Sequence, residues 1–599
     1  MPIDVTSLYN RRADNRWERV CVGDILERVT WSRPDRVAIT GWPGAFGEPR
    51  FERLTYRQAD QIANQFSHGL LAHVATPERG QARLSRDRPR GLTRGDRVLL
   101  ICENSVEAYL AKLATAKAGL VAVPVNPSLA PDVLAYLIEL AEPRFVIVDA
   151  ELWPGVADVI GAAGLRPDVT IPIGGTVAPG GVLFSEFIEA QPVTEPDAVV
   201  HGDDIWEILF TSGTTAMPKG VMLSHTYAHM GAMSFALSLT RGLRVEADLT
   251  LCSFLPVIYH VADEVLSLPA FLAGGSLVIG RKPVPAQMAE AIAREKVTAL
   301  WGGSPQLVKA LAAELDARQP GLGEHSLDAH SLQVLVYGWG AVEPAVRTRL
   351  QEMCGDQFLL VGIFGQTEAI SCHRFWPDVW EDTYLATAPQ LNYVGIPNPL
   401  LGSTVMDGDG RHLLDQPGVP GEAVYRSPAV ASGYYRDEAA TQAAFRHGWF
   451  HSGDSCMVDE NGLRIMVDRY KDIIKSGGEN VSSLRVEAIL HQHADVLKAA
   501  VIGLEHDRWG EAVTAIVVPQ PEAVPGVGGL TEDALIAFCR ERLAGFETPK
   551  GVIFATALPE TVGGKVLKYR LRQQLAGHYQ AAEHEGDHEA GRGGGREVT

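Results

Sequence analysis

The sequence lacks the cysteine patterns of a zinc ribbon or a disulfide framework. Its seven cysteines are odd in number and scattered, and no two of them stand in C-x-x-C spacing. Disulfide-rich secreted domains and zinc ribbons both depend on such regular spacings. This cysteine usage indicates a reduced chain, and we expect a cytoplasmic protein.

The sequence also lacks a run of apolar residues long enough to span a bilayer, and residues 1–19 contain no apolar signal core. We therefore expect no integral membrane segment. Positive charge is scarce, since 53 lysines and arginines stand against 73 acidic residues and give a formal net charge of −20. An acidic surface argues against nucleic acid or an anionic membrane as the main partner.

Apolar strands alternate with helical segments over most of the chain. Strands are expected at Val98–Ile101, Val121–Val125 and Phe145–Val148, with helices between them. This alternation is typical of an α/β protein whose mostly parallel sheets are covered by helices. We expect a large N-terminal domain of several subdomains over residues 1–468.

The pattern changes after Asp468. Short strands near 499–502, 515–518 and 552–554, with a helix near 531–543, predict a small α+β C-terminal domain over residues 469–576. Residues 577–599 are rich in His, Glu and Gly. They hold little apolar material for a core, so we expect them to form a disordered tail.

Hydroxyl-bearing and small residues fill the segment Thr211-Ser-Gly-Thr-Thr-Ala-Met-Pro-Lys-Gly220, which lies between two apolar runs. The backbone N–H groups and hydroxyls of such a loop can donate to a triphosphate, and Lys219 can neutralise its charge. The glycine spacing differs from that of the G-x-x-x-x-G-K-[ST] nucleotide loop. Alone, the segment fits a polar surface loop about equally well.

Two acidic motifs follow downstream. Phe364-Gly-Gln-Thr-Glu368 comes after an apolar strand, so that its aromatic ring can cover a flat base. The hydroxyl of Thr367 and the carboxylate of Glu368 can contact a phosphate and its Mg²⁺. Asp454 stands on a tight turn and can accept from both hydroxyls of a ribose. By itself, each motif also fits an ordinary turn.

Two basic motifs complete the series. Arg469, Lys471 and Lys475 precede the paired glycines Gly477 and Gly478. Further on, Lys565 follows two glycines in the segment 558–568, and its amine can reach a site that this loop covers. Each basic motif alone would be a charged surface turn, so the assignment depends on their common order.

The five motifs, in this order and spacing, resemble those of the adenylate-forming superfamily, which includes acyl-CoA synthetases, luciferases and peptide-synthetase adenylation domains. The resemblance extends from about Val22 to Leu575. It implies a large N-terminal domain and a small mobile C-terminal lid. It also implies ATP- and Mg²⁺-dependent activation of a carboxylic acid to an acyl-adenylate, followed by thioester formation with coenzyme A.

The resemblance gives each motif residue a role. The catalytic residues would be Lys565, Glu368, Thr215 and Lys219, with Glu368 as the metal ligand. The ATP and AMP site would contain Thr211, Ser212, Gly213, Thr214, Thr215, Lys219, Phe364, Gly365, Gln366, Thr367, Asp454, Arg469 and Lys475. The acid pocket would contain Tyr259, His260, Gly338, Trp339 and Gly340. Gly477, Gly478 and Glu479 would face coenzyme A, and Lys471 would be the hinge.

The acid pocket departs from the family pattern at two places. Trp339 stands where small residues usually line the pocket, and one extra residue precedes His260. An indole inside the pocket favours a short, branched or aromatic acid over a long chain, whereas an indole turned into the core favours neither. Asp263 is offset from the aspartate that binds the substrate amine in amino-acid-activating members, which disfavours an α-amino acid.

Several alternatives stay open at this point. The acceptor could be an acyl carrier protein or an amine instead of coenzyme A, and the activated acid need not be a carboxylic acid. A non-catalytic nucleotide-binding scaffold is disfavoured, because such a protein would not need Lys565.

Overall fold

The computed structural model describes residues 19–73, 92–211, 217–239, 249–259, 261–319, 326–523, 525, 530–560 and 566–579. The chain separates into two compact units, and each is described by itself. Unit 1 consists of Met1–Trp380, Ile396–Ser403 and Tyr425–His451. Unit 2 consists of Glu381–Gly395, Thr404–Val424 and Ser452–Thr599.

The first sheet of unit 1 has the strand order β7-β6-β5-β3-β4-β8-β9. Strand β9 pairs antiparallel with β8, and the other neighbours pair in parallel. The bounds are β3 (Arg97–Ile101), β4 (Val121–Pro124), β5 (Phe145–Asp149), β6 (Val169–Ile171), β7 (Val182–Leu183), β8 (Ile205–Thr211) and β9 (Lys219–Ser224). The strands expected from the apolar alternation are therefore confirmed.

The second sheet of unit 1 runs in the order β2-β1-β11-β10-β12-β13-β14-β15. Its central pairs are parallel, while β2 and β15 pair antiparallel with their neighbours. The bounds are β1 (Val37–Gly41), β2 (Arg53–Thr55), β10 (Thr250–Ser253), β11 (Ser276–Ile279), β12 (Ala299–Gly303), β13 (Val334–Tyr337), β14 (Leu359–Gln366) and β15 (Ala369–Phe375).

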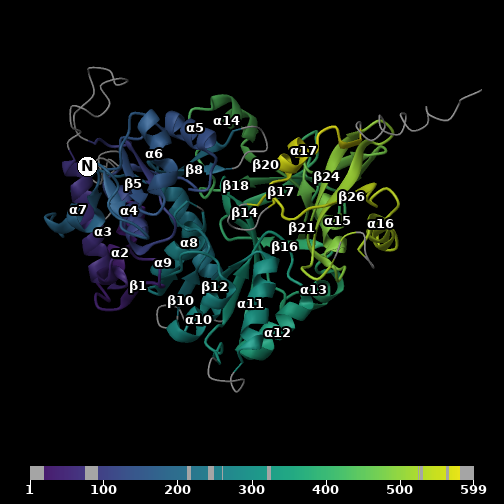
Figure 1. The fold of residues 1–599 in the computed structure, drawn as a ribbon, viewed down its shortest axis with the longest axis horizontal. Coiled ribbons are helices and arrows are strands. Elements are labelled where there is room, and N and C mark those ends of the chain that lie inside the picture. Colours follow the sequence, from purple (N-terminus) through teal and green to yellow (C-terminus); the bar gives the residue numbers. More distant parts are fainter. Residues whose placement is uncertain are drawn as a thin grey trace, which may run out of the picture. The chain divides into compact units, whose positions relative to one another are not determined.

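Helices cover both sheets, as the apolar alternation requires. Figure 1 shows α10, α11 and α12 side by side, and their apolar faces pack with strands of the second sheet into one core. The helices of unit 1 have the bounds α2 (Ile25–Thr30), α3 (Tyr56–Ala72), α4 (Val106–Lys117), α5 (Pro131–Ala141), α6 (Trp153–Ala162), α7 (Phe184–Glu189), α8 (His225–Leu239), the π-helix η4 (Asp263–Ser267), α9 (Leu268–Leu272), α10 (Pro285–Glu295), α11 (Pro305–Ala317), α12 (Pro344–Cys354) and α14 (Glu438–Ala444), with short 3₁₀ turns η2 (Val22–Asp24) and η3 (Pro49–Phe51).

Helix α4 is unusual because all of its residues are buried, Lys112 and Lys117 included. A buried ammonium group is costly unless it is paired with negative charge. Both lysines are paired, and their partners are described with the site below.

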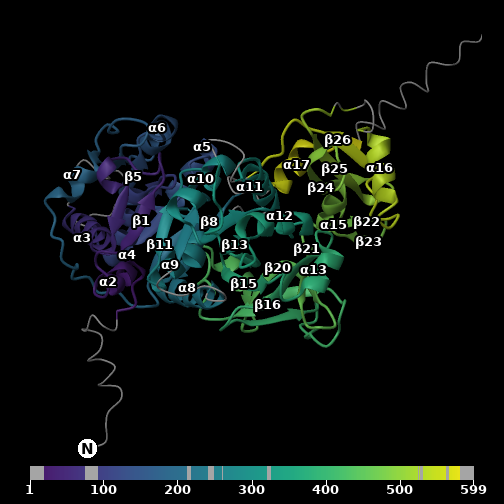
Figure 2. The ribbon, with the colours of Figure 1, turned by 90° about the horizontal axis from the view of Figure 1, so that it is seen from below.

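Unit 2 contains two sheets (Figure 2). The first has the order β17-β18-β20-β21-β16, and its strands belong wholly or in part to this unit. The bounds are β16 (Asn392–Pro397), β17 (Gly402–Met406), β18 (Gly421–Arg426), β20 (Trp449–Val458) and β21 (Arg464–Arg469), with helix α13 (Glu381–Thr387). The short strand β19 (Phe445–Arg446), which belongs to unit 1, pairs with the first two residues of β20.

The second sheet of unit 2 follows the order β23-β22-β25-β24, with β26 beside β25. Its bounds are β22 (Ile474–Ser476), β23 (Glu479–Val481), β24 (Val496–His506), β25 (Gly510–Pro519) and β26 (Gly551–Phe554), and it packs with α15 (Ser483–Leu490), α16 (Glu532–Arg540) and α17 (Lys568–Gln574). This is the small α+β arrangement that the sequence after Asp468 predicts.

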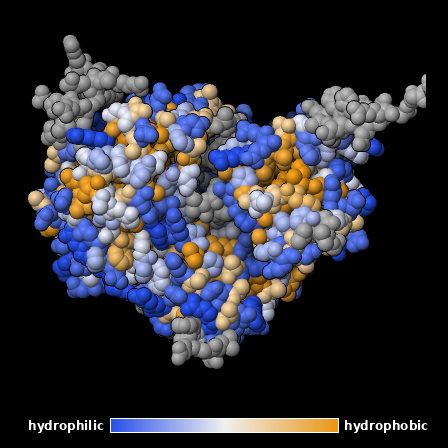
Figure 3. All heavy atoms as spheres, viewed as in Figure 1, coloured by the Kyte–Doolittle hydropathy of each residue, from blue (hydrophilic) through white to orange (hydrophobic). Residues whose placement is uncertain are grey.

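No helix among the described residues is long and apolar enough to cross a membrane. Figure 3 shows polar and apolar side chains intermixed over the visible face of each unit.

The packed part of unit 2 extends beyond Gly577, where the sequence predicts the start of the tail. The Tyr579 hydroxyl lies 3.0 Å from Thr514 Oγ1, and the Tyr579 ring lies 5.0 Å from that of His506. Tyr579 also packs against the apolar cluster formed by β24, β25 and α17. A large aromatic side chain therefore anchors the chain two residues past the predicted boundary.

Deleting residues 580–599 is expected to leave the melting temperature unchanged, because the apolar residues of this stretch are three alanines and one valine. Deleting residues 578–599 also removes Tyr579, and we expect a fall of a few degrees, since partial burial of an aromatic side chain stabilises by roughly 1–2 kcal/mol. Scanning calorimetry of both truncations tests this. Equal melting temperatures would contradict a packing role for Tyr579.

Candidate active site

Three proposed site residues of unit 1 lie near or beyond the carboxyl ends of parallel strands. Tyr259 follows β10, Trp339 follows β13, and Phe364 lies near the end of β14. Strands β13 and β14 are in register from Val334 and Leu359 onward. Trp339, just past the end of β13, and Phe364 of β14 therefore lie at the same edge of the sheet. Ligands of open α/β sheets bind outside this edge.

The segment Thr211–Gly220, proposed to bind the phosphates, connects the two strands of a β-hairpin. Thr211 ends β8 and Lys219 begins β9, and the two are paired directly across the strands. The hairpin therefore brings the lysine beside the first hydroxyl of the segment. Ser212, Gly213, Thr214 and Thr215 lie outside the described residues.

The motif 364–368 occupies the hairpin between β14 and β15. Phe364 is paired with His373, with ring centroids 6.2 Å apart, and Gln366 is paired with Ala369 across the turn. The turn is held from α8, where the Tyr227 hydroxyl donates to the Thr367 carbonyl over 2.8 Å. Gly365, between the two paired positions, lies in β14.

Glu368 is buried, and its carboxylate is oriented by Tyr434. The Tyr434 hydroxyl donates to Glu368 Oε1 over 2.8 Å, and the backbone N–H of Ala431 donates to the Glu368 carbonyl over 2.7 Å. The ring of Tyr434 lies 4.9 Å from Lys219 Nζ. An oriented carboxylate that still has a second oxygen fits the hard, oxygen-seeking Mg²⁺ ion. The sequence motifs do not include Tyr434, and its only local signal is an aromatic pair after Gly433.

Trp339 has a left-handed backbone, with φ of +63°, and the residue is 42% exposed. The indole ring lies 5.5 Å from that of Trp301. A Cβ added to Gly303 would lie 3.5 Å from this indole, and the N–H of Gly338 donates to the Gly303 carbonyl over 2.9 Å. The ring thus lies at the strand edge and does not fill the core. Gly340 follows in an extended-to-left-handed conformation with φ of +158°.

Tyr259 is hydrogen-bonded to a residue at the edge of the first sheet. Its hydroxyl donates to Glu103 Oε2 over 3.2 Å, just past the end of β3. Burial raises the pKa of Glu103, and burial together with the Glu103 charge raises the pKa of Tyr259, so the phenol stays protonated as the donor. His260, the next residue, lies outside the described residues.

Asp454 and Arg469 form a pair in unit 2. They are register partners on the antiparallel strands β20 and β21, and Arg469 Nε lies 3.0 Å from Asp454 Oδ1. The Asp454 side chain is buried, and its backbone N–H donates to Ser452 Oγ over 3.0 Å. The guanidinium therefore holds the carboxylate in a fixed orientation.

Lys471 stands between two residues that are anchored to different elements. The N–H of Tyr470 donates to the Gly453 carbonyl of β20 over 3.1 Å, whereas Asp472 Oδ1 accepts from Arg572 of α17 over 2.7 Å. Burial lowers the pKa of Lys471 to about 8, with Arg469 and Arg572 acting in the same direction. This is where the resemblance places the hinge.

A two-residue turn connects β22 and β23. Both Gly477 and Gly478 have positive φ, at +62° and +91°, and Ser476 pairs with Glu479 across the turn. Such hairpin turns need left-handed residues, for which glycine has no steric penalty. Lys475 and Glu479 flank the turn and are exposed.

Lys565 itself lies outside the described residues. The segment that carries it is closed by an antiparallel bridge between Glu560 and Val566, and the N–H of Leu567 donates to the Pro559 carbonyl over 2.7 Å. In unit 1 the structure thus brings together Thr211, Lys219, Phe364 and Glu368, and in unit 2 Asp454, Arg469 and Lys471.

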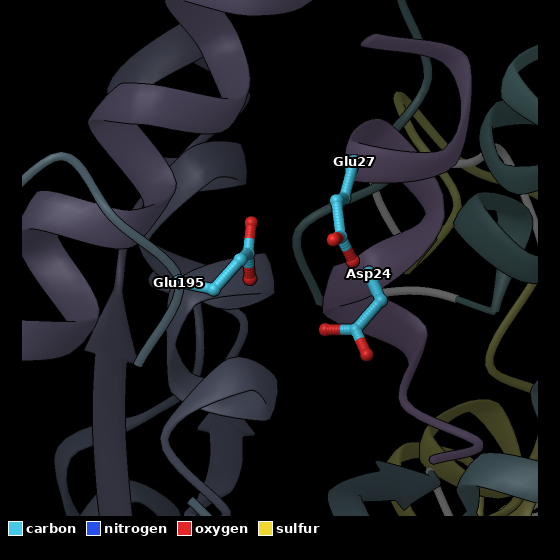
Figure 4. Close-up of side chains that lie close together, drawn as sticks. All are labelled: Asp24, Glu27 and Glu195. Carbon is cyan, nitrogen blue, oxygen red and sulfur yellow. The ribbon is translucent and has the colours of Figure 1, made fainter. Parts of the chain in front are cut away.

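Among the residues of unit 1 that the structure describes, two clusters of carboxylates lie elsewhere. Figure 4 shows Asp24 and Glu27 on one continuous helical stretch, η2 and α2, and Glu195 on a separate segment of the chain. Arg19 Nε lies 2.9 Å from Asp24, and Lys117 Nζ lies 2.8 Å from Glu195. Basic side chains thus already neutralise part of this cluster, which is a network of ion pairs.

The second cluster is centred on Lys112 and is completely buried. Lys112 Nζ lies 2.6 Å from Glu207 Oε1 of β8 and 2.5 Å from Asp263 Oδ2 of η4, and Glu264 is the third carboxyl group. Burial raises the pKa of Glu207 to about 8 and that of Glu264 well above its usual range. Burial alone would lower the pKa of Lys112, but the carboxylates raise it. The ammonium takes the place that a metal ion would occupy.

Known proteins resemble this chain over most of its length. A family described as AMP-binding enzyme matches residues 84–435, and its C-terminal domain matches residues 485–565. The chain is 30% identical over 564 residues to a long-chain-fatty-acid–CoA ligase, FadD13, of Mycobacterium tuberculosis, covering 92% of this chain and 99% of that one. It is 32% identical over 513 residues to a feruloyl-CoA synthase of an Amycolatopsis species, covering 85% and 94%. Among solved structures, ATP-bound MatB from Rhodopseudomonas palustris superposes with a TM-score of 0.74 at 27% identity, covering 93% of this chain and 99% of that one.

Proposed function

The chain belongs to the family of AMP-binding enzymes and is an AMP-forming acid–thiol ligase of the acyl-CoA synthetase type, and we propose that the residues described above carry out its two half-reactions on a compact carboxylic acid. In the first, a carboxylate attacks the α-phosphorus of ATP and pyrophosphate leaves. In the second, the thiol of coenzyme A attacks the acyl-adenylate and AMP leaves. The pairing of Thr211 with Lys219 at the mouth of the β8–β9 hairpin is the observation that supports this most directly.

The proposed roles in nucleotide binding follow from the geometry. The hairpin would hold the phosphates, with Lys219 neutralising their charge. The ring of Phe364 would cover the adenine, and Asp454, oriented by Arg469, would accept from the ribose hydroxyls. Mg²⁺ held by Glu368 would stabilise the charge that gathers on the phosphoryl oxygens.

The two half-reactions would use different residues of the C-terminal domain, so this domain would have to move between them. Lys565 would stabilise charge that develops during adenylation, whereas the turn at Gly477 and Gly478 would face the thiol in the second half-reaction. The anchoring of Tyr470 to β20 and of Asp472 to α17 supports a pivot at Lys471. A rotation at one backbone position can present different faces of a domain in turn.

Replacing Lys471 with proline is expected to separate the two half-reactions. The proline ring fixes φ and also restricts the preceding residue, so the pivot loses its freedom. One half-reaction should continue at a near-normal rate while the other fails, as measured by pyrophosphate release and by thioester formation from synthetic acyl-adenylate. Lys471→Ala is the control and should retain both. A proline variant that completes the cycle normally would place the pivot elsewhere.

The position of Trp339 supports a compact acid. The residue is exposed at the strand edge and its ring lies beside Gly303, so it would occupy space that a small residue at this position would leave open. A short, branched or aromatic acid would fit against such a ring, and an aromatic acid could stack on it. The feruloyl-CoA synthase relative acts on an aromatic acid, whereas the FadD13 relative acts on long chains.

Trp339→Gly is expected to shift the preference toward longer or bulkier acids. Because glycine also suits the left-handed backbone at this position, the fold should tolerate the change. The measurement is the ratio of kcat/KM values for a long-chain and an aromatic acid, in the variant and the wild type. A wild-type preference for the long chain, or an unchanged ratio in a folded variant, would refute the compact-acid proposal.

Pyrophosphate release across a panel of acids tests the proposed function as a whole. The panel contains benzoate, ferulate, 2-methylpropanoate, hexanoate and palmitate, each with and without coenzyme A. Coenzyme A should stimulate turnover, with an acyl-CoA as the product. Stimulation only by an acyl carrier protein or only by an amine would instead assign a different acceptor, and the absence of nucleotide-dependent chemistry with every acid would contradict the proposal.

A further inference from the structure

Tyr434 contacts two proposed site residues of opposite charge through different parts of its side chain. Its hydroxyl donates to Glu368 Oε1 over 2.8 Å, and its ring lies 4.9 Å from Lys219 Nζ. Glu368 is the proposed Mg²⁺ ligand, and Lys219 the proposed phosphate-binding lysine. The two charged residues are far apart in the sequence, and all three residues belong to unit 1.

Backbone hydrogen bonds fix the position of Tyr434. On one side, the N–H of Tyr435 donates to the Gly220 carbonyl over 2.7 Å, and Tyr434 forms an antiparallel bridge with Val221 of β9. On the other side, the N–H of Ala431 donates to the Glu368 carbonyl over 2.7 Å. Residues 430–435 therefore link β9 of the first sheet to the start of β15 in the second.

The turn before Tyr434 depends on glycine. Gly433 has a φ of +126°, and a Cβ there would lie 2.8 Å from Thr441 Cγ2. The Thr441 hydroxyl also accepts from the N–H of Tyr434 over 2.9 Å. The backbone of Tyr434 is thus held independently of its side chain, so substitutions of the side chain can be expected to leave the link between the sheets in place.

The two side-chain contacts have distinct chemistry. A phenol that donates to an ionised carboxylate makes a charge-assisted hydrogen bond, which is stronger and more directional than a neutral one. The face of the phenol ring attracts an ammonium group through its quadrupole. One neutral side chain can therefore orient a carboxylate and hold an ammonium group while keeping the two charges from pairing directly.

We propose that Tyr434 is a positioning residue for adenylation, which orients the metal-binding carboxylate of Glu368 and holds Lys219 beside the phosphate site. The inference rests on the roles proposed above for these two residues. It follows that metal binding and nucleotide binding are coupled through one side chain, and that the two contacts can be removed separately. Tyr434→Phe removes the hydroxyl and keeps the ring, whereas Tyr434→Leu removes both.

A matched control comes from the next residue. Tyr435 is partly buried, and its ring lies 5.2 Å from the Arg436 guanidinium rather than against the site residues. Its contact with Gly220 uses the backbone N–H. Tyr435→Phe should therefore leave metal and nucleotide binding unchanged while it tests the loss of a phenol hydroxyl in the same segment.

The experiment measures metal binding without turnover. Full-length wild type and the three variants are titrated with Mn²⁺ in the presence of α,β-methylene-ATP, and free Mn²⁺ is followed by electron paramagnetic resonance. Tyr434→Phe should weaken Mn²⁺ binding by about tenfold, as expected for a lost hydrogen bond to a charged group. Its affinity for the nucleotide analogue without metal should not change. Tyr434→Leu should weaken both, and the melting temperatures are recorded for every variant.

The outcomes separate this inference from the proposed function. A folded Tyr434→Phe variant that binds Mn²⁺ as tightly as the wild type would overturn the inference alone. The inference would also be overturned if Tyr434→Phe and Tyr434→Leu lost the same affinity for Mn²⁺ and the same affinity for the nucleotide analogue. Equal losses in Tyr435→Phe would also overturn it, because the effect would then be general to the segment. A wild type that binds neither the analogue nor Mn²⁺ would overturn the proposed function and this inference together.

Discussion

Lys112→Met is expected to lower the free energy of unfolding by roughly 3–5 kcal/mol, because the change leaves buried carboxyl groups without their cation. Lys112 Nζ lies within 2.6 Å of Glu207 and Asp263, and all three side chains are completely buried. Methionine keeps most of the volume and removes only the charge. The measurement is chemical denaturation at pH 7, with far-UV circular dichroism as the signal.

A surface lysine provides the control for this prediction. Lys309 forms an ion pair of 3.2 Å with Glu343, and the two side chains are 61% and 41% exposed. Exposed pairs contribute about 0–1 kcal/mol, so Lys309→Met should have little effect. Similar losses of unfolding free energy in the two variants would show that burial does not determine how much the Lys112 ion pairs contribute to stability.

The pH dependence of the Lys112 cluster has a defined sign. The folded pKa of Glu207 is raised to about 8, above its ordinary value of 4.5, so this group contributes stability at low pH and loses it as the pH rises toward 8. Without the ammonium, the carboxyl groups should resist ionisation more strongly. The cost of Lys112→Met should therefore be smaller at pH 5 than at pH 8, and the opposite order would contradict this account.

Lys565→Ala is expected to slow adenylation by ~10²–10³, which is typical for the loss of one preorganised group that stabilises charge in the transition state. Thioester formation from synthetic acyl-adenylate should be affected much less, since this charge is absent from the second half-reaction. Pyrophosphate release and thioester formation are measured separately. Equal damage to both half-reactions would rule out the assigned role.

A neighbouring lysine is the matched control for Lys565. Lys498 Nζ pairs with Glu560 over 2.5 Å, and Glu560 closes one side of the segment that carries Lys565. Lys498→Ala disturbs this flank without removing the proposed catalytic amine. Adenylation by this variant should stay within a few-fold of the wild type, and a loss as large as that of Lys565→Ala would point to a general disturbance of the segment.

Local patterns in the sequence predict the elements that hold the site. The apolar runs on both sides of residues 211–220 predict strands, and β8 and β9 lie there. The paired glycines at 477 and 478 predict a tight turn, and both have positive φ. Strand periodicity and turn chemistry act over a few residues, so one window of sequence contains the information that decides them.

Contacts between distant segments could not be read in this way. Glu368 and Tyr434 are separated by 66 residues, and Lys112 and Asp263 by 151. Lys112 stands in a helix whose sequence would also fit a solvated face, yet all sides of α4 are covered. The partner of a side chain depends on strand register and on which helix covers which face, and no local window specifies either.

The sequence by itself thus determined the α/β class, the order of the five motifs and the family to which they point. Only the tertiary structure decided that Arg469 faces Asp454, that the indole of Trp339 stays at the strand edge, and that Tyr434 joins Lys219 to Glu368. The physical reason is that backbone conformation follows from neighbouring residues, whereas the environment of a side chain is created by packing of segments that meet only in the folded chain.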